Sequence, residues 1–307
     1  MTKRERLQAA VEGRSGDRVP VGFWYHFPLE HPSGEELAEA ELAFAKKYDP
    51  DFLKVMHDLP FDLPDGMTSV ERPEDWLKIR PVDPRTGSFA DQLSALKAIK
   101  KGLDDDMPVI DTIFDPYATA NKLCGKKIME HLHANSEAVR HGLQVIAITL
   151  ANYAAAWIAE GGDGIFYALD GAEESVTTRE EYAEVFLPFD RMILESAMEK
   201  GTFNVLHIHG TGIFFDLVHA LPAHVLNWSS KTTAPSLTEA RGLHSGCIAG
   251  GIDETTILEK SALEVMNEGK QAIAEAGEDG FILACGCAIP TETPEESIFA
   301  IRATVLD

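Results

Sequence analysis

The sequence predicts an α/β protein that folds as a single (β/α)₈ TIM barrel over residues 1–307. Short apolar segments rich in Val, Ile and Phe recur along the chain, and helical patterns separate them. Most of these segments do not alternate with polar residues, as expected of parallel strands that are buried on both faces. The expected strands cover residues 19–23, 52–56, 108–114, 164–168, 203–208, 224–228, 246–250 and 281–285. An open, doubly wound sheet is the alternative fold.

The expected helices have recognisable start and stop signals. Capping boxes are predicted for Ser33 with Glu36, Thr178 with Glu181, and Thr293 with Glu296, with Pro294 at a first helical position. The longest helical pattern begins near residue 136 and ends at two glycines, residues 161 and 162. Residues 57–107 are less regular, so we expect an insertion there. We find no internal repeat or linker that would divide the chain.

The composition is that of a globular protein, with 45% apolar and 25% charged residues. The formal charge of 27 − 50 = −23 argues against nucleic acid or an anionic membrane surface as a partner. The chain shows no run of about 20 apolar residues and no apolar core of a signal peptide at its start. We therefore expect a cytoplasmic protein whose four cysteines are reduced, with Cys124 and Cys247 buried and inert.

Polar groups gather where the expected strands end, which is where the active site of a TIM barrel lies. These strand-end residues are Trp24, Tyr25, His26, His57, Asp58, Asp115, Asp170, His207, His209, Asn227, Asp253, Cys285 and Cys287. His207 and His209 are two apart on a strand, so their side chains should project side by side, as half of a metal site would. The histidines of HLH at residues 131–133 fall on a helix, where this spacing separates them, and we expect both at the surface.

Several longer segments, in their order and spacing, resemble the uroporphyrinogen decarboxylase superfamily, whose members are TIM barrels. They are RERLQAAVEGRSGDRVPV, YDPDFLKVMHD, IAEGGDGIFYALDGAEESVTTREEYAEVFLPFDRMI, HIHGTG, GCIAGGID and FILACGCAIPTETPEES. The resemblance covers most of the chain and implies one of two chemistries, metal-free decarboxylation of a tetrapyrrole or cobalamin-linked methyl transfer.

The decarboxylase branch grips the acetate groups of its substrate with arginines placed just after the first strand. This chain has FWYHFPLEHP there and no arginine between Arg18 and Arg72. Asp58 does match the aspartate that holds the pyrrole nitrogens in that branch. A net charge of −23 would repel a substrate with many carboxylates, so decarboxylation is the alternative function.

The methyltransferase branch has a zinc site formed by a His-x-Cys motif and by a later cysteine in a Gly-Cys turn. This chain resembles that branch at both positions. This match implies that His207, His209 and Cys287 are the zinc ligands, with His209 replacing a cysteine and Cys285 as a possible substitute ligand. Two histidines and one cysteine at strand ends also suit a catalytic zinc site, because three protein ligands leave one position open.

The resemblance therefore implies a zinc-dependent methyltransferase that acts between a corrinoid (methylcobamide) and a small thiol or similar acceptor. The corrinoid would arrive on a separate carrier protein, and the enzyme would be a monomer or homodimer. Asp58 is the expected catalytic residue. The expected substrate-contacting or orienting residues are Trp24, Tyr25, His26, His57, Asp170, Asn227 and Cys285. A third possibility is a non-catalytic barrel that binds a corrinoid or a metal.

Overall fold

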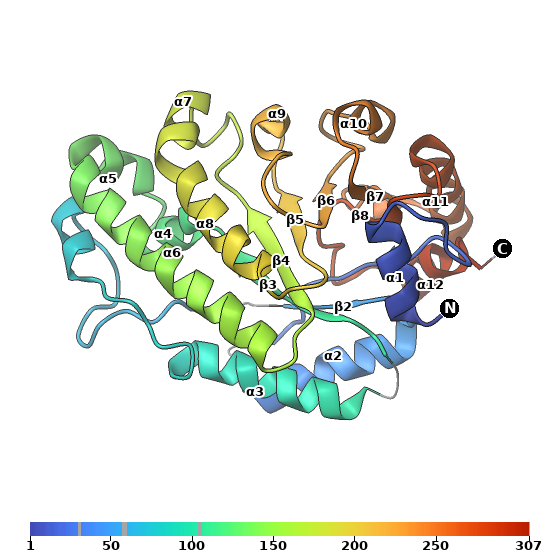
Figure 1. Ribbon diagram of the computed structural model, residues 1–307, viewed down its shortest axis with the longest axis horizontal. Helices are drawn as coiled ribbons and strands as arrows, with labels where there is room; N and C mark the ends of the chain where they lie inside the picture. Colours follow the sequence, from blue (N-terminus) through green and yellow to red (C-terminus); the bar gives the residue numbers. More distant parts are fainter. Residues whose placement is uncertain (30–31, 57–59, 104–105, 307) are drawn as a thin grey trace.

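Eight parallel strands form the sheet in the computed structural model, which describes residues 1–29, 32–56, 60–103 and 106–306 (Figure 1). The strands are β1 Val21–Gly22, β2 Leu53–Val55, β3 Val109–Phe114, β4 Gly164–Leu169, β5 Val205–Ile208, β6 Val225–Trp228, β7 Cys247–Ile252 and β8 Phe281–Cys285. Their order is β1-β8-β7-β6-β5-β4-β3-β2, so neighbours in sequence are neighbours in space and β1 returns to β8. This order confirms the TIM barrel and excludes a doubly wound sheet, whose strand order reverses.

Asp51 joins the two strands at the seam of the barrel. Its backbone N–H donates to the Val21 carbonyl at 2.8 Å, and its carboxylate accepts from the Val21 N–H, also at 2.8 Å. The same fully buried carboxylate binds the guanidinium groups of Arg6 at 2.6 Å and Arg18 at 2.7 Å. The short strands β1 and β2 are therefore held together through one charged side chain.

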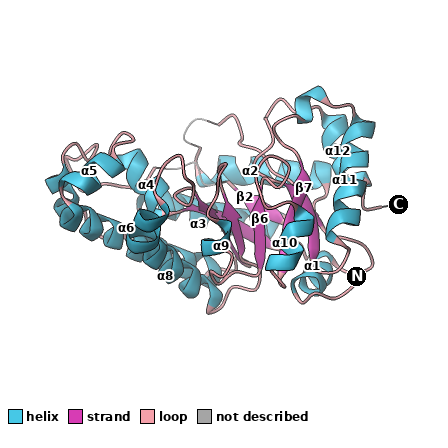
Figure 2. Cartoon of the chain, turned by 90° about the horizontal axis from the view of Figure 1, so that it is seen from above, coloured by secondary structure: helices cyan, strands magenta, loops and turns pink. Residues whose placement is uncertain are grey.

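Helices surround the strands and cover the outer face of the barrel (Figure 2). They are α1 Lys3–Val11, α2 Gly34–Tyr48, η1 Pro73–Lys78, α3 Gly87–Gly102, α4 Pro116–Leu123, α5 Ile128–Ala134, α6 Ser136–Ala159, α7 Arg179–Glu181, η2 Tyr182–Phe186, α8 Leu187–Met198, α9 Phe215–Val218, α10 Leu237–Leu243, η3 Ile257–Glu259, α11 Ala262–Ala276 and α12 Glu295–Ala303. Both termini lie on the same side of the molecule in the two views (Figures 1 and 2).

Two of the three predicted capping boxes are present, at the starts of α2 and α7. The third prediction, at Thr293, is wrong. The Thr293 hydroxyl donates to the Pro290 carbonyl at 2.6 Å, and α12 begins at Glu295 with Pro294 as its N-cap. A hydroxyl already bonded to the preceding turn is not available to cap a helix.

Helix α6 matches the longest helical pattern and is long and apolar enough to cross a membrane. However, 56% of its apolar window is buried inside the protein, as in the core helix of a folded domain. The connection from β2 to α3 is irregular, as expected, and carries η1 among its described residues.

One prediction for the HLH motif is wrong. His131 is buried, and its Nδ1 accepts a hydrogen bond from Trp76 Nε1 at 3.1 Å. Trp76 lies in η1 of the β2–α3 connection, far from His131 in the sequence. The spacing of residues around His131 therefore could not predict this contact. His133 is exposed as expected, with Nε2 2.6 Å from Glu181. Cys124 and Cys247 are both buried, in agreement with the prediction.

Candidate metal centre

His207, His209 and Cys287 meet at the carboxyl ends of β5 and β8. His207 lies within β5 and is buried, whereas His209 follows the strand and is exposed. Cys287 lies two residues beyond β8 and is partly buried. One ligand atom from each residue lies within 4.8 Å of the other two. Two imidazoles and a thiolate at such spacing form a donor set that suits zinc and leaves a fourth position for substrate.

A sharp turn after β5 directs His209 toward this cluster. The His209 N–H donates to the Leu169 carbonyl at 3.0 Å, which continues the pairing with β4. Gly210 then adopts a φ of 102°, and Glu173 accepts from the Thr211 N–H at 2.8 Å. A backbone φ of this size is strained for any residue with a Cβ, so the turn favours glycine at position 210.

Asn227 fixes the orientation of His207. The two residues are register partners on β5 and β6, and His207 Nδ1 lies 2.7 Å from Asn227 Oδ1. The Asn227 amide nitrogen donates to the Ala249 carbonyl at 3.1 Å and the Cys285 carbonyl at 3.0 Å. Its oxygen must therefore accept, so His207 Nδ1 carries a proton and Nε2 is the ring atom left to bind a metal.

Glu254, which was not among the predicted site residues, positions the turn that carries Cys287. Its buried carboxylate accepts from the Gly286 N–H at 3.1 Å and from the Ser229 hydroxyl. A Cβ on Gly286 would lie 2.5 Å from the Ser229 backbone, so the Gly-Cys turn requires this glycine. Asp253, the strand-end residue before it, accepts hydrogen bonds from the hydroxyl groups of Thr255 and Thr256 in the turn after β7.

In the absence of metal, the Cys287 thiolate and the His209 imidazolium form an ion pair. Burial opposes ionisation of Cys287, but attraction to His207 and hydrogen bonds to both histidines lower its pKa to about 4. The hydrogen bond to Cys287 raises the pKa of His209 to about 9, against the opposing effect of burial. At neutral pH the thiol is therefore a thiolate and the His209 imidazole is cationic.

Asp170 faces the same cluster from the end of β4. Burial raises its pKa, while attraction to the His209 and His207 imidazoles partly offsets that rise. Asp115, by contrast, is a structural group. It caps α4 through the Ala118 N–H at 2.7 Å and accepts from the Gly171 N–H at 3.0 Å.

A lysine lies inside the barrel close to His207, and it was also missed. Lys54 is buried, with Nζ 4.6 Å from the centre of the Phe166 ring and 5.6 Å from that of Trp24. The Phe166 ring stacks on His207 with centroids 5.2 Å apart. In the sequence, the one feature that could have indicated this position is a lysine within the otherwise apolar segment FLKVM.

The other predicted site residues differ in burial. Trp24 is buried in the barrel interior against Phe166, whereas Tyr25 is partly buried against Phe27 and Phe44. His26 is exposed. His57 and Asp58 fall outside the described residues.

The interpretation of Cys285 as a ligand or substrate contact is wrong. The side chain is fully buried with the cluster that packs between sheet and helices, whereas its neighbour Ala284 packs inside the barrel. Alternate residues of a strand face opposite sides of the sheet, so Cys285 points away from the barrel axis. Burial raises the pKa of its thiol well above the usual value, which keeps it protonated.

Comparison with known proteins places the chain among enzymes of this fold. It is 24% identical over 231 residues to the methylcobamide:CoM methyltransferase MtbA of Methanosarcina mazei, covering 75% of this chain and 67% of that protein. The protein of the same name from Methanosarcina acetivorans is 22% identical over 230 residues, with the same coverage.

The solved structures show that the barrel is shared. A methyltransferase from Methanosarcina mazei superposes with a TM-score of 0.84 at 20% identity, over 99% of this chain and 98% of that chain. A B12-independent methionine synthase from Shewanella gives a TM-score of 0.62 at 14% identity, over 93% and 91% of the two chains. The profile of the family Uroporphyrinogen decarboxylase (URO-D) matches residues 2–306. This chain is therefore a member of the uroporphyrinogen decarboxylase family.

Proposed function

We propose that this protein is a zinc-dependent methyltransferase that moves a methyl group between a corrinoid and a small thiol or similar acceptor. The observation that carries the proposal is the three-donor cluster of His207, His209 and Cys287, with the His207 tautomer fixed by Asn227. The names of the relatives from Methanosarcina, methylcobamide:CoM methyltransferases, support the same chemistry.

Each residue of the site has a task in this proposal. The two histidines and Cys287 hold the metal, and the exposed position of His209 leaves the cluster open to the barrel mouth. Zinc bound there would lower the pKa of a coordinated substrate thiol, which then exists as a nucleophilic thiolate near neutral pH. Asn227 and Glu254 orient His207 and the Cys287 turn. Asp170 orients the bound substrate from the end of β4.

The corrinoid would be presented at the barrel mouth by a separate carrier protein in the cytoplasm. Decarboxylation of a tetrapyrrole is less well supported, because its substrate carboxylates need cations near β1. Arg18, the arginine that shortly precedes β1 in the sequence, forms an ion pair with Asp51 at the seam of the barrel. We place Asp58 as a catalytic group only by its family correspondence.

Metal content and methyl transfer together test the proposal. The purified protein should contain about one zinc per chain. His209→Ala and Cys287→Ser should lose it, while His133→Ala, which removes an exposed histidine outside the cluster, should keep it. The zinc-loaded protein should demethylate free methylcobalamin with 2-mercaptoethanesulfonate or 2-mercaptoethanol, followed by the absorbance of the corrinoid. Full zinc binding with no transfer to any thiol would reject methyl transfer to thiols, and failure to bind zinc would reject the metal site.

A further inference from the structure

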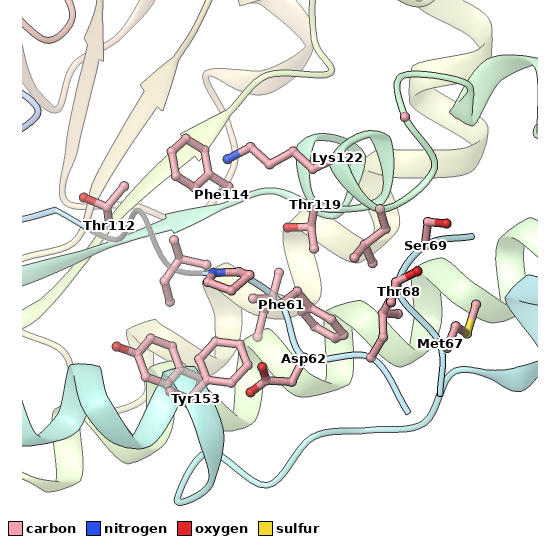
Figure 3. Close-up of a pocket in the computed structure, with 17 residues that line it drawn as sticks. Phe61, Asp62, Met67, Thr68, Ser69, Thr112, Phe114, Thr119, Lys122 and Tyr153 are labelled. Atoms are coloured by element: carbon pink, nitrogen blue, oxygen red, sulfur yellow. The ribbon is translucent and has the colours of Figure 1, made fainter. Parts of the chain in front are cut away.

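A cavity of about 640 Å³ lies beside the barrel mouth, between the end of β3, residues 60–69 and helices α4 and α6 (Figure 3). Residues 112–114 of β3 line it together with residues 60–63 and 67–69, which follow β2 in the sequence.

The walls of this cavity favour a flat apolar molecule. Four aromatic rings contribute to them, from Phe61, Phe89, Phe114 and Tyr153. Phe89 meets Phe61 edge-on, with centroids 6.1 Å apart, and lies 4.7 Å from the Tyr153 ring. Aromatic rings prefer such edge and offset contacts with other rings, and the volume is in the range of small-molecule sites.

The charges in the cavity favour an anion at one end. Lys122 is the single lysine or arginine among the described lining residues, and its Nζ lies 3.9 Å from the centre of the Phe114 ring. The Asp62 carboxylate is at the far end of the cavity from this ammonium, where it accepts from the Ser88 N–H at 3.0 Å (Figure 3). In a protein of net charge −23, such a local cation is required to hold an anion.

The cavity also lies close to the candidate metal ligands. Phe114 is the register partner of Ala168, and Ala168 is the partner of His207. All three belong to the inward-facing set of alternating positions that includes Ile110, Phe166 and Val205. Phe114 and His207 are thus two strands apart, which is roughly 10 Å, and Ala168 is the register position between them.

We propose that this cavity is a binding site for a compact aromatic anion, with its carboxylate or sulfonate at Lys122 and its ring among Phe61, Phe89 and Tyr153. The proposal concerns binding of the anion and does not rest on the proposed methyl transfer.

Three probes that share one ring system test the site: 2-naphthoate, 2-naphthalenesulfonate and neutral 2-naphthol, titrated into the full chain at pH 7 by calorimetry. At least one of the two anions should bind about tenfold more tightly than the naphthol, and the two anions together distinguish carboxylate from sulfonate. Lys122→Gln should remove that preference and leave naphthol binding unchanged. Lys127→Gln is the matched control, because it removes a nearby exposed lysine that does not line the cavity.

A second variant tests the location of the ring. Leu150→Trp fills the cavity from α6 and should abolish binding of all three probes. Equal affinities of the anions and naphthol, an unchanged anion preference in Lys122→Gln, or no binding of any probe to the folded wild-type chain would overturn the proposal. The titration is repeated on Cys287→Ser, where binding should persist. A protein that binds the anions through Lys122 but transfers no methyl group keeps this site and loses the proposed function.

Discussion

The Oδ1 atom of Asn227 lies 2.7 Å from Nδ1 of His207, and both residues are buried in register on neighbouring strands. Neither side chain has freedom to rotate, because the amide nitrogen of Asn227 is bonded to two backbone carbonyls. The orientation of one candidate metal ligand is therefore built into the sheet itself. This rigidity supports the interpretation of the cluster as a preorganised metal site.

We expect Asn227→Ala to lower zinc affinity by about 10–100-fold, the usual cost of removing a group that orients a metal ligand. The reason is that His207 loses the acceptor that keeps its proton on Nδ1. Competition with a chromogenic chelator measures the affinity, and Asn267→Ala on the exposed face of α11 is the control. Unchanged affinity in a folded Asn227→Ala variant would show that His207 is oriented by other contacts.

Glu254→Ala should also weaken zinc binding, by about 10-fold or more. The change removes the acceptor for the Gly286 N–H and frees the turn that carries Cys287. Circular dichroism should show a folded barrel, while the chelator assay shows the loss. Glu278→Ala removes an exposed carboxylate that precedes β8, at the opposite end of the strand from Cys287, and should have no effect. If both variants bind zinc as the wild type does, the turn needs no support from Glu254.

Zinc binding should release about one proton near pH 7.5. The pKa of His209 is raised to about 9, so its imidazole carries a proton that the metal must displace. The pKa of Cys287 is lowered to about 4, so its thiol is already ionised and releases none. Between about pH 7 and 9 the apparent affinity should rise about tenfold per pH unit and then level off, because above the His209 pKa no proton remains to be displaced.

Calorimetry in two buffers with different ionisation enthalpies counts these protons. A count near two would mean that the Cys287 thiol is protonated before the metal binds. A count near zero would mean that the His209 imidazole is already neutral. Either result would contradict the ion pair between these two residues.

Asp51→Asn should destabilise the protein by about 3–5 kcal/mol, as expected when one partner of a buried ion pair is removed. Arg18 would lose its ion pair with Asp51 at the seam between β1 and β2, and Arg6 would keep only its pair with the more exposed Asp17. Urea unfolding followed by fluorescence measures the change. Asp91→Asn, at an exposed position of α3, should shift the midpoint little. A comparable shift in both variants would mean that the seam is not held by the buried carboxylate.

The sequence by itself determined the barrel, because its strands are short apolar runs whose burial on both faces is visible residue by residue. The pairing of His207 with His209 was equally local, since two residues on a strand share a face. Both inferences need only the period of a strand. For the same reason the sequence could place Asn227 and Cys287 at strand ends without saying what they touch.

The tertiary structure decided which of these groups meet. Cys285 and Cys287 have the same local spacing as the histidines, but the first faces the helices and the second turns inward after Gly286. His131 is buried only because Trp76 reaches it from a distant segment. Glu254 and Lys54 gained their roles in the same way, through contacts between strands far apart in the chain. Such contacts depend on barrel closure and strand register, which no local periodicity records.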